Sequence, residues 1–330
     1  MSLLEVTDLR VEFKGRSADP VHAVNGIDLI VERAETIGVV GESGCGKSTL
    51  ARALIGLVKP SDGSIKYDGI ELTGASSAAR WAMRRRMQMV FQDPFASLDP
   101  RMRIGQIISE PLRIHKLGGR TDRQRRIEDL LDLVELPSNA ASSFPHEVSG
   151  GQRQRVGIAR ALAAGPELLI LDEPVSALDV SIQAQILNLL IDLRERLQIA
   201  FIFISHDLSV VRHVSNKVVV MYLGKIVESG PASELFSRPA HPYTQALLAA
   251  APLPDPRAER QRERIVLSGE LPSPMNLPTG CPFHTRCPIA IDVCRHVAPV
   301  LEIIPAVDGR SAPPHIAACH RTQTPISRSR

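Results

Sequence analysis

The sequence predicts an α/β protein with a mainly parallel sheet, and three observations carry this prediction. Short apolar runs alternate with helical patterns through residues 1–236, as they do in βα units. Three runs are continuously apolar, which is typical of strands buried on both faces: Ile37–Val40, Leu168–Leu171 and Ile199–Ile204. Between the last two runs, apolar residues three or four positions apart predict an amphipathic helix with Ile182, Ile186, Leu189, Leu193 and Leu197 on one face.

The composition is that of an ordinary folded chain. It has 330 residues, 44% of them hydrophobic and 23% charged, which is enough for two domains. The net charge of +3 gives no overall field that would attract nucleic acid, and the runs Arg84–Arg86 and Arg120–Arg126 are interpreted as solvated helix faces. No apolar run approaches the roughly 20 residues of a membrane-spanning helix. The N-terminus, MSLLEVTDLR, lacks the pattern of a signal peptide. We therefore expect the protein to be located in the cytosol or on the cytosolic side of a membrane.

Changes in composition along the chain suggest two domains. Residues 93–160 are more helical and more basic than their surroundings, which indicates a helical subdomain inserted into a domain of residues 1–236. Prolines then become frequent, at Pro239, Pro242, Pro252, Pro254 and Pro256. We expect residues 237–330 to form a small Cys/Pro-rich appendage with one short helix near Tyr243–Ala251. Its tail, 321–330, is expected to be disordered.

A phosphate-binding loop is predicted where the chain reads GESGCGKST, because this stretch fits G-x-x-x-x-G-K-[ST] between an apolar run and a helical pattern. The glycines let backbone N–H groups surround phosphate oxygens at a helix N-terminus. Lys47 is expected to reach the β- and γ-phosphates, and Ser48 to ligate Mg²⁺. The predicted ATP-binding residues of the loop are Gly41, Ser43, Gly44, Cys45, Gly46, Lys47, Ser48 and Thr49.

Further polar residues follow other predicted strands, at the sheet edge where ligands bind in open α/β folds. Asp172 ends a buried run and is expected to hold Mg²⁺, and Glu173 is the candidate general base for an attacking water. His206 is the candidate γ-phosphate sensor, and Gln92 could contact both the metal and the water. The alternative is a purely structural role for Glu173 and His206. The catalytic candidates are Glu173, His206 and Gln92, and the Mg²⁺ candidates are Ser48, Gln92 and Asp172.

A second anion site is indicated by SGGQ at Ser149–Gln152, directly ahead of a helical pattern. Either one chain binds two phosphates, or two chains share one nucleotide. With this motif added, the chain resembles the ATP-binding subunits of ABC transporters. The resemblance rests on the P-loop, Gln92, SGGQRQR, LLILDEP, SALD at 176–179 and His206.

The resemblance implies a P-loop NTPase (RecA-like) core with an antiparallel β edge, which binds and hydrolyses Mg-ATP. It places Phe13 where the family has an aromatic ring that stacks on adenine; the alternative for Phe13 is core packing. It also implies that two subunits clasp ATP between them, so that each signature faces ATP held by the partner. The signature residues in that arrangement are Ser149, Gly150, Gly151, Gln152 and Asp179.

Four longer stretches narrow the resemblance to the oligopeptide/dipeptide importer branch: FQDPFASLDPRM, SALDVSIQAQILNLL, HPYTQALLAAAP and CPFHTRCP. The sequences GESGCGKST and VMYLGKIVESG resemble the second of its two non-identical ATPase subunits. This implies a translocase subunit, peripheral on the cytoplasmic face of the inner membrane. Its expected partners are a paralogous ATPase subunit, two transmembrane permease subunits and, indirectly, an external solute-binding protein, with no nucleic acid. The alternatives are import of nickel or another small solute, an exporter ATPase, and an ABC ATPase that acts on nucleic acid.

The C-terminal cysteines allow three interpretations. Cys281, Cys287, Cys294 and Cys319 do not form a C-x-x-C pattern. They could be buried structural thiols, ligands of a [4Fe-4S] cluster, which related members of this branch imply, or ligands of zinc. A metal would stabilise a short, proline-rich segment with little core of its own.

Overall fold

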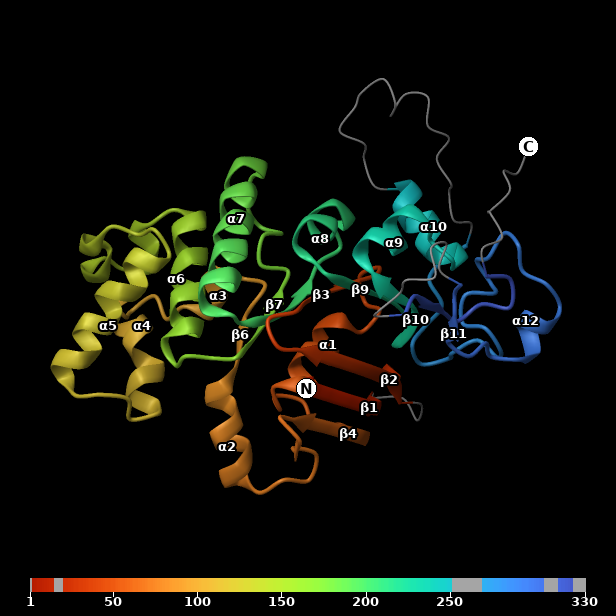
Figure 1. Cartoon of the computed structure of the whole chain (residues 1–330), viewed down its shortest axis with the longest axis horizontal. Coiled ribbons are helices and arrows are strands. Elements are labelled where there is room, and N and C mark those ends of the chain that lie inside the picture. Colours follow the sequence, from red (N-terminus) through yellow and green to blue (C-terminus); the bar gives the residue numbers. More distant parts are fainter. Residues whose placement is uncertain (1, 15–19, 251–268, 306–313, 323–330) are drawn as a thin grey trace. The chain divides into compact units, whose positions relative to one another are not determined.

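The computed structural model describes residues 2–14, 20–250, 269–305 and 314–322, and the chain forms two compact units (Figure 1). The first unit comprises Met1–Leu4, Ile30–Thr36 and Lys66–Ile204. The second unit comprises Glu5–Leu29, Ile37–Ile65 and Ser205–Arg330. From residue 323 on, the tail for which disorder is predicted lies outside the described residues.

The first unit contains a parallel sheet with β7 (Leu168–Asp172) between β6 (Met87–Val90) and β8 (Ala200–Ile204). Leu171 pairs with Val90 on one side and with Phe203 on the other. Every residue of β7 and β8 is buried. This burial on both faces explains why the two strands appear in the sequence as unbroken apolar runs.

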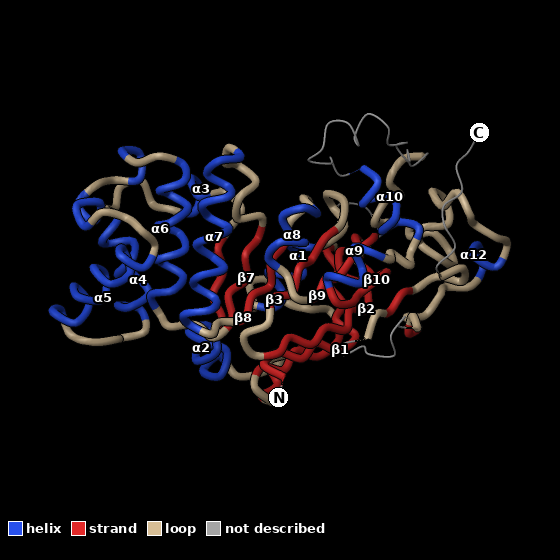
Figure 2. Tube along the Cα trace, turned by 45° about the horizontal axis from the view of Figure 1, so that its top comes forward, coloured by secondary structure: helices blue, strands red, loops and turns tan. Residues whose placement is uncertain are grey.

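The chain between β6 and β7 is helical. It forms α3 (Pro94–Ser97), α4 (Ile104–Ile114), α5 (Arg120–Leu133), the 3-10 helices η1 (Ser138–Ser142) and η2 (Pro145–Glu147), and α6 (Gly150–Ala163). Helices α4, α5 and α6 pack against one another (Figure 2). Ile104, Ile108 and Leu112 lie on the buried face of α4 at helical spacing. Helix α2 (Ser77–Arg86) precedes β6. Its N-cap is Ser76, whose hydroxyl accepts the Ala79 N–H at 3.2 Å.

Helix α7 (Val180–Leu197) joins β7 to β8 and is the amphipathic helix that the sequence predicts. Its buried residues are Ile186, Leu187, Leu189, Leu190 and Leu193. The buried face differs from the predicted one at its two ends. Leu197, the last helical residue, is 40% exposed, and Ile182 in the first turn is only partly buried.

A second, four-stranded sheet has the order β2-β1-β4-β5. Its strands are β1 (Ser2–Phe13), β2 (Val21–Glu32), β4 (Asp62–Tyr67) and β5 (Ile70–Glu71). Most of β1, β2 and β4 belongs to the second unit. Strands β4 and β5 are antiparallel, with Tyr67 opposite Ile70, which fits the predicted antiparallel edge.

The second unit also contains strands in the order β11-β12-β10-β9-β3. They are β3 (Thr36–Val40), β9 (Lys217–Tyr222), β10 (Lys225–Pro231), β11 (Glu302–Ile303) and β12 (Ile316–Ala317). Only the β3–β9 pair in this series is parallel. The two last strands come from the C-terminal region, which therefore extends the sheet rather than standing apart from it. The described residues of this unit form the helices α1 (Lys47–Leu54), α8 (Leu208–Val214), α9 (Ala232–Ser237), α10 (Pro242–Ala250) and α12 (Val293–His296).

A buried carboxylate bonds the C-terminal region to β10. Glu228 is fully buried and accepts the N–H groups of Ala240 at 2.7 Å and His241 at 2.9 Å. Nε2 of His315 lies 2.7 Å from the same carboxylate. The short helix predicted near Tyr243–Ala251 is confirmed as α10. Among the described residues, none of the helices has the length and apolar character needed to cross a bilayer.

Candidate nucleotide-binding site

The predicted P-loop joins β3 to α1 in the second unit. Gly46 is the N-cap of α1 and has φ 105°, and a Cβ there would lie 2.0 Å from the carbonyl oxygen of Ala23. Gly44 has φ 80° and open space where a Cβ would point. The loop therefore has a backbone shape that requires glycine. It also has room beside a helix N-terminus, which is what a phosphate group needs.

Lys47 is held inside this loop. Its side chain is 5% exposed, and Nζ donates to the carbonyls of Gly41 at 2.7 Å and Glu42 at 2.9 Å. Cys45 is 1% exposed, and burial raises the pKa of its thiol, so it packs as a small apolar residue. Of the other loop residues, Ser43 is exposed, and Ser48 and Thr49 are half-buried in the first turn of α1.

In the first unit, the structure brings Gln92 and Glu173 together. Nε2 of Gln92 donates to Oε2 of Glu173 at 3.0 Å. Asp172 ends β7 and is 1% exposed, whereas Glu173 lies beyond the strand and is half-buried. Glu173 has φ 48°, and its N–H donates to the carbonyl of Ile204 at the end of β8. A left-handed backbone at a non-glycine residue is strained, and such strain gathers at functional sites.

Four of the signature residues, Ser149 to Gln152, lie at the start of α6. Ser149 is its N-cap: the Ser149 hydroxyl accepts the Gln152 N–H at 3.3 Å, and Oε1 of Gln152 accepts the Ser149 N–H at 2.9 Å. This capping box fixes the direction of the helix N-terminus. Gly151 must be glycine, because a Cβ there would lie 2.5 Å from Cγ2 of Ile182 on α7. The first-turn N–H groups of α6, at Gly150 and Gly151, are those that a helix leaves for a ligand.

Asp179 caps the neighbouring helix α7. Its Oδ1 accepts the Ile182 N–H at 3.0 Å and the Ser181 hydroxyl at 2.7 Å. These bonds, above all that from Ser181, lower the pKa of Asp179. The structure thus gives Asp179 a helix-capping role that the sequence analysis does not assign.

Two family models match the chain. The one described as "ABC transporter" matches residues 24–176, and "Oligopeptide/dipeptide transporter, C-terminal region" matches residues 227–294. The oligopeptide transport ATP-binding protein AppF of Bacillus subtilis is 49% identical over 97% of both chains. The corresponding protein OppF of Salmonella typhimurium is 52% identical over 91% of this chain and 92% of its own. This chain belongs to the ATP-binding proteins of ABC transporters.

Solved structures agree with this assignment. The dimeric structure of MJ0796, described as a bacterial ABC transporter cassette, is 28% identical with a TM-score of 0.64. It covers 69% of this chain and 98% of its own. The predicted fold class is therefore confirmed, and the protein is an ABC ATPase that binds and hydrolyses ATP.

Two further predicted residues of this ABC ATPase are accessible to a ligand. Phe13, the last residue of β1, is 42% exposed, so its ring is not packed in the core. An exposed aromatic face is what stacking on a base requires. His206 follows the end of β8 and is also exposed.

Two residues of the C-terminal region that contact the P-loop, Tyr243 and Arg286, are not predicted from the sequence. Glu42, within the motif, donates its N–H to the Tyr243 hydroxyl at 2.8 Å. Its carboxylate pairs with Arg286, at 2.7 and 3.1 Å. Tyr243 and Arg286 lie within HPYTQALLAAAP and CPFHTRCP, two stretches noted only for their resemblance.

The four C-terminal cysteines of this ABC ATPase are free thiols. Burial raises the pKa values of Cys281 and Cys287 to about 11, and the nearby Cys294 and Cys319 add to both shifts. The Arg321 N–H donates to the sulfur of Cys319 at 3.3 Å. Within the described residues, however, His, Cys, Asp and Glu side chains form no group of three or more that could hold a metal ion. Cys281 and Cys294 are buried, and Cys287 and Cys319 are partly buried, which fits the interpretation as structural thiols.

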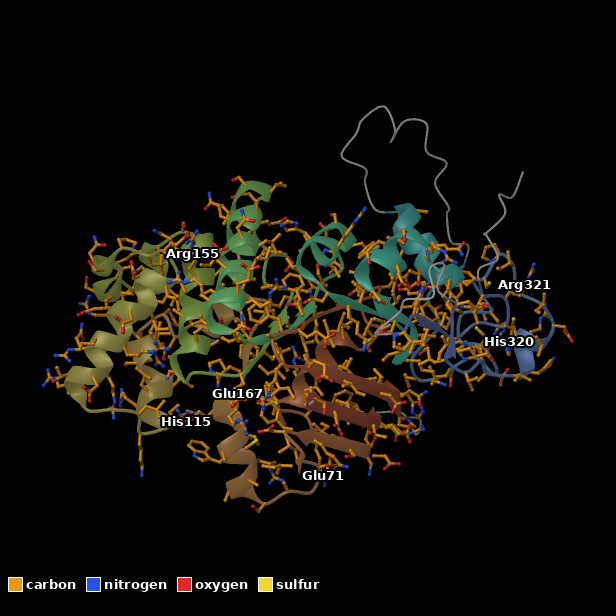
Figure 3. All side chains as sticks on the ribbon, viewed as in Figure 1. Glu71, His115, Arg155, Glu167, His320 and Arg321 are labelled. Atoms are coloured by element: carbon orange, nitrogen blue, oxygen red, sulfur yellow. The ribbon has the colours of Figure 1, made fainter. Side chains whose placement is uncertain are left out.

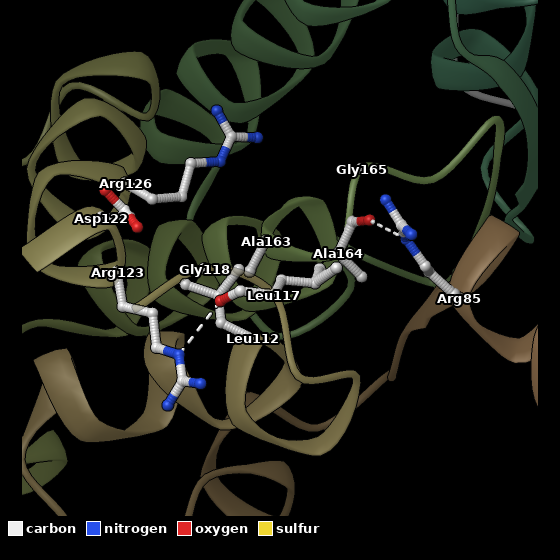
Figure 4. A pocket seen from close by; sticks show the side chains of 10 residues that line it. All are labelled: Arg85, Leu112, Leu117, Gly118, Asp122, Arg123, Arg126, Ala163, Ala164 and Gly165. Carbon is white, nitrogen blue, oxygen red and sulfur yellow. Dashed lines mark hydrogen bonds between the residues drawn. The ribbon is translucent and has the colours of Figure 1, made fainter. Parts of the chain in front are cut away.

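Two cavities in the first unit contain none of the predicted site residues. One, of about 310 Å³, has an apolar floor that includes Leu112 and Ala163, and arginines around it (Figure 4). Two of these arginines are fixed: Nε of Arg85 donates to the Ala164 carbonyl at 3.2 Å, and Nε of Arg123 to the Leu117 carbonyl at 3.0 Å. The other, of about 470 Å³, is lined by Trp81 and His115, among others.

Proposed function

We propose that this ABC ATPase is the energy-coupling subunit of an importer for oligopeptides or dipeptides. The observation that carries the proposal is the extent of the likeness to AppF, which covers 97% of both chains and so includes the C-terminal region. A likeness limited to the ATPase cassette would support only membership of the ABC ATPases and would not indicate a solute class. The match of residues 227–294 to the oligopeptide/dipeptide transporter C-terminal region points to the same solute class.

In this proposal, two ATPase subunits clasp Mg-ATP between them. Residues of the P-loop with Phe13 bind ATP, and Ser48, Gln92 and Asp172 hold Mg²⁺. Glu173 accepts a proton from the attacking water, Gln92 orients that water, and His206 contacts the γ-phosphate. The N-terminus of α6 faces ATP held by the partner, where a helix N-terminus stabilises negative charge. The Gln92–Glu173 hydrogen bond supports the pairing of metal contact and general base.

The proposed partners are a paralogous ATPase subunit, two transmembrane permease subunits and, indirectly, an external solute-binding protein. The protein would then be peripheral on the cytoplasmic face of the inner membrane. Residues 1–236 form the ATPase domain in this scheme, and 237–330 the transporter-type extension. Closure and opening would reach the permease through Asp93–Arg103, the segment that follows Gln92.

The identity of the transported solute distinguishes this proposal from import of nickel or another small solute. The experiment is co-purification with the permease subunits, followed by uptake assays with a panel of di- and oligopeptides and nickel. We expect ATP-dependent peptide uptake. Uptake of nickel alone would replace the peptide assignment and leave the ATPase assignment intact.

Replacement of Glu173 by Gln tests the proposed general base. The variant should bind ATP and slow hydrolysis by roughly 10²–10⁴-fold, because an amide cannot accept the proton of the attacking water. The measurement is single-turnover hydrolysis with the ATP affinity determined in parallel. Normal turnover would remove Glu173 from this role.

We also propose a [4Fe-4S] cluster on the four C-terminal cysteines. It is supported by the occurrence of four cysteines between positions 281 and 319 and by the Arg321 N–H, which donates to the Cys319 sulfur at 3.3 Å. Backbone donors of this kind stabilise cysteine thiolates. Anaerobic purification with iron and sulfide analysis tests it, and a colourless protein without iron would end it.

A further inference from the structure

Residues of the C-terminal region hold the second residue of the P-loop, Glu42, from two directions. Its backbone N–H donates to the Tyr243 hydroxyl at 2.8 Å. Its carboxylate accepts from Nη1 of Arg286 at 2.7 Å and from Nη2 at 3.1 Å. Arg286 lies 244 positions later in the chain than Glu42, and all three residues belong to the second unit.

The same residue also contacts the P-loop lysine. The Glu42 carbonyl accepts from Nζ of Lys47 at 2.9 Å and from the Cys45 N–H at 3.3 Å. Glu42 is therefore the link between the C-terminal region and the ammonium group expected to reach the phosphates. A shift of Glu42 would move Lys47 and the loop backbone together.

Packing makes this contact rigid. The Arg286 side chain is 9% exposed, and its planar fork meets the carboxylate with two parallel bonds, a geometry that lysine cannot reproduce. Arg286 is oriented by a turn in which its N–H donates to the Phe283 carbonyl at 3.0 Å. The Phe283 ring packs against Tyr222 and Tyr243, with ring centres 5.3 and 5.4 Å apart. This turn lies between Cys281 and Cys287, so the cysteine segment itself carries the contact.

We propose that Arg286 and Tyr243 are positioning residues for nucleotide binding, and that they hold the P-loop in its phosphate-binding shape before ATP arrives. This rests on the proposed role of the P-loop in binding Mg-ATP. A loop ordered in advance loses less conformational freedom on binding, so the contact should raise the affinity for ATP. It should change turnover at saturating ATP much less, because neither residue is placed at the reacting atoms.

The test compares Arg286→Ala and Glu42→Gln in the full-length chain. We expect each to raise the Kd for Mg-ATP by about tenfold, as loss of preorganisation predicts. The double variant should be no worse than either single variant, because both remove the same interaction. Arg286→Lys should recover part of the affinity, since it keeps the charge but not the fork. Arg295→Ala, at an exposed arginine of α12, is the matched control and should bind ATP as the wild type does.

Melting temperature without nucleotide separates positioning from folding. A purely structural contact would lower the melting temperature and leave the Kd of the folded protein unchanged. If Arg286→Ala does not fold, Glu42→Gln supplies the same comparison from the more exposed partner, whose side chain is 28% accessible. An unchanged Kd, a lower Kd, or additive effects in the double variant would overturn the inference. Lys47→Ala distinguishes failure of this inference from failure of the proposed function. If that variant bound ATP as the wild type does, the P-loop assignment itself would be wrong.

Discussion

Single residues of α6 show how strictly the signature helix is specified. Gly151 and Gly157 lie on the same helix, but their surroundings differ. A Cβ at Gly151 would lie 2.5 Å from Cγ2 of Ile182, whereas a Cβ at Gly157 would meet nothing within 4 Å. The Ile182 branch is stiff, because Cγ2 is attached directly to the β-carbon. The contact between α6 and α7 therefore depends on the missing side chain at Gly151.

Substitution of these two glycines by alanine should have opposite effects. Gly151→Ala should destabilise the protein by about 1–3 kcal/mol through overpacking against Ile182. Gly157→Ala should stabilise it by roughly 0.5–1 kcal/mol, because alanine favours the helix and fits the space. Urea denaturation of both variants measures the difference. Equal effects at the two positions would contradict the packing of Gly151 against α7.

At the scale of single residues, the sequence predicts site residues that lie in one contiguous motif. It does not predict contacts between residues that are far apart in the chain. The P-loop, Ser149 and Glu173 are predicted as site residues because each lies in a short motif whose neighbours have fixed roles. The Glu42–Arg286 pair cannot be found in this way, since 244 positions separate the two residues and neither spacing nor periodicity relates them. Asp179 is found as a motif residue, but its capping bonds become visible only with the geometry of α7.

Among the elements of the first unit, four charged residues connect the edges of several strands and helices. Arg33 pairs with Asp68 and Glu167, each at 2.7 Å. Arg86, at the end of α2, also pairs with both, at 2.8 and 2.6 Å. Glu167, labelled in Figure 3, precedes β7. The bond from Arg86 is the main cause that lowers the pKa of Glu167.

We expect this network to contribute stability that depends on pH and is lost in acid. Because the folded pKa of Glu167 lies below its ordinary value of 4.5, the contribution is present above pH 4.5 and is lost as the pH falls through the folded pKa. Glu167→Gln should therefore lower the free energy of unfolding at pH 7 by roughly 0.5–1 kcal/mol, a modest value because the carboxylate is partly exposed. Urea titrations from pH 7 to pH 3 should show the gap closing. Glu128→Gln, on the exposed face of α5, is the control, and a gap independent of pH would count against the network.

The length of a strand explains whether it can be predicted from the sequence. Strands β7 and β8 each have five residues, all of them buried, and stand out as apolar runs. Strands β11 and β12 have two residues each, too few to show a period. Strand β12 pairs with β10 and β11 pairs with β12, and long-range contacts such as that between Glu228 and His315 accompany this pairing. The proline-rich composition of the C-terminal region therefore hides its contribution to the sheet.

At the level of the whole molecule, the proposed shared site separates ATP binding from ATP hydrolysis. Ser149→Arg should leave the Kd of a single subunit for Mg-ATP unchanged, because in the proposed arrangement Ser149 contacts only the ATP held by the partner. It should abolish hydrolysis in the assembled ATPase pair, since a bulky cation would occupy the place of the γ-phosphate.

Equilibrium binding and steady-state hydrolysis measure the two effects of Ser149→Arg. Ser149→Ala removes the cap but adds no bulk, and it controls for the loss of about 1 kcal/mol that a missing N-cap causes. Equal loss of binding and hydrolysis in Ser149→Arg would argue for a complete site within one chain.

The pairing of β12 with β10 has a consequence for how the chain can be shortened. A strand at the rim of a sheet offers unsatisfied N–H and C=O groups to any passing chain, and this is a common origin of aggregation. Here residues beyond position 300 cover that rim, with Ala317 opposite Glu228 and Ile316 opposite Ser229. We therefore expect a chain cut after residue 300 to expose this edge of β10 and to aggregate more readily than the full-length chain.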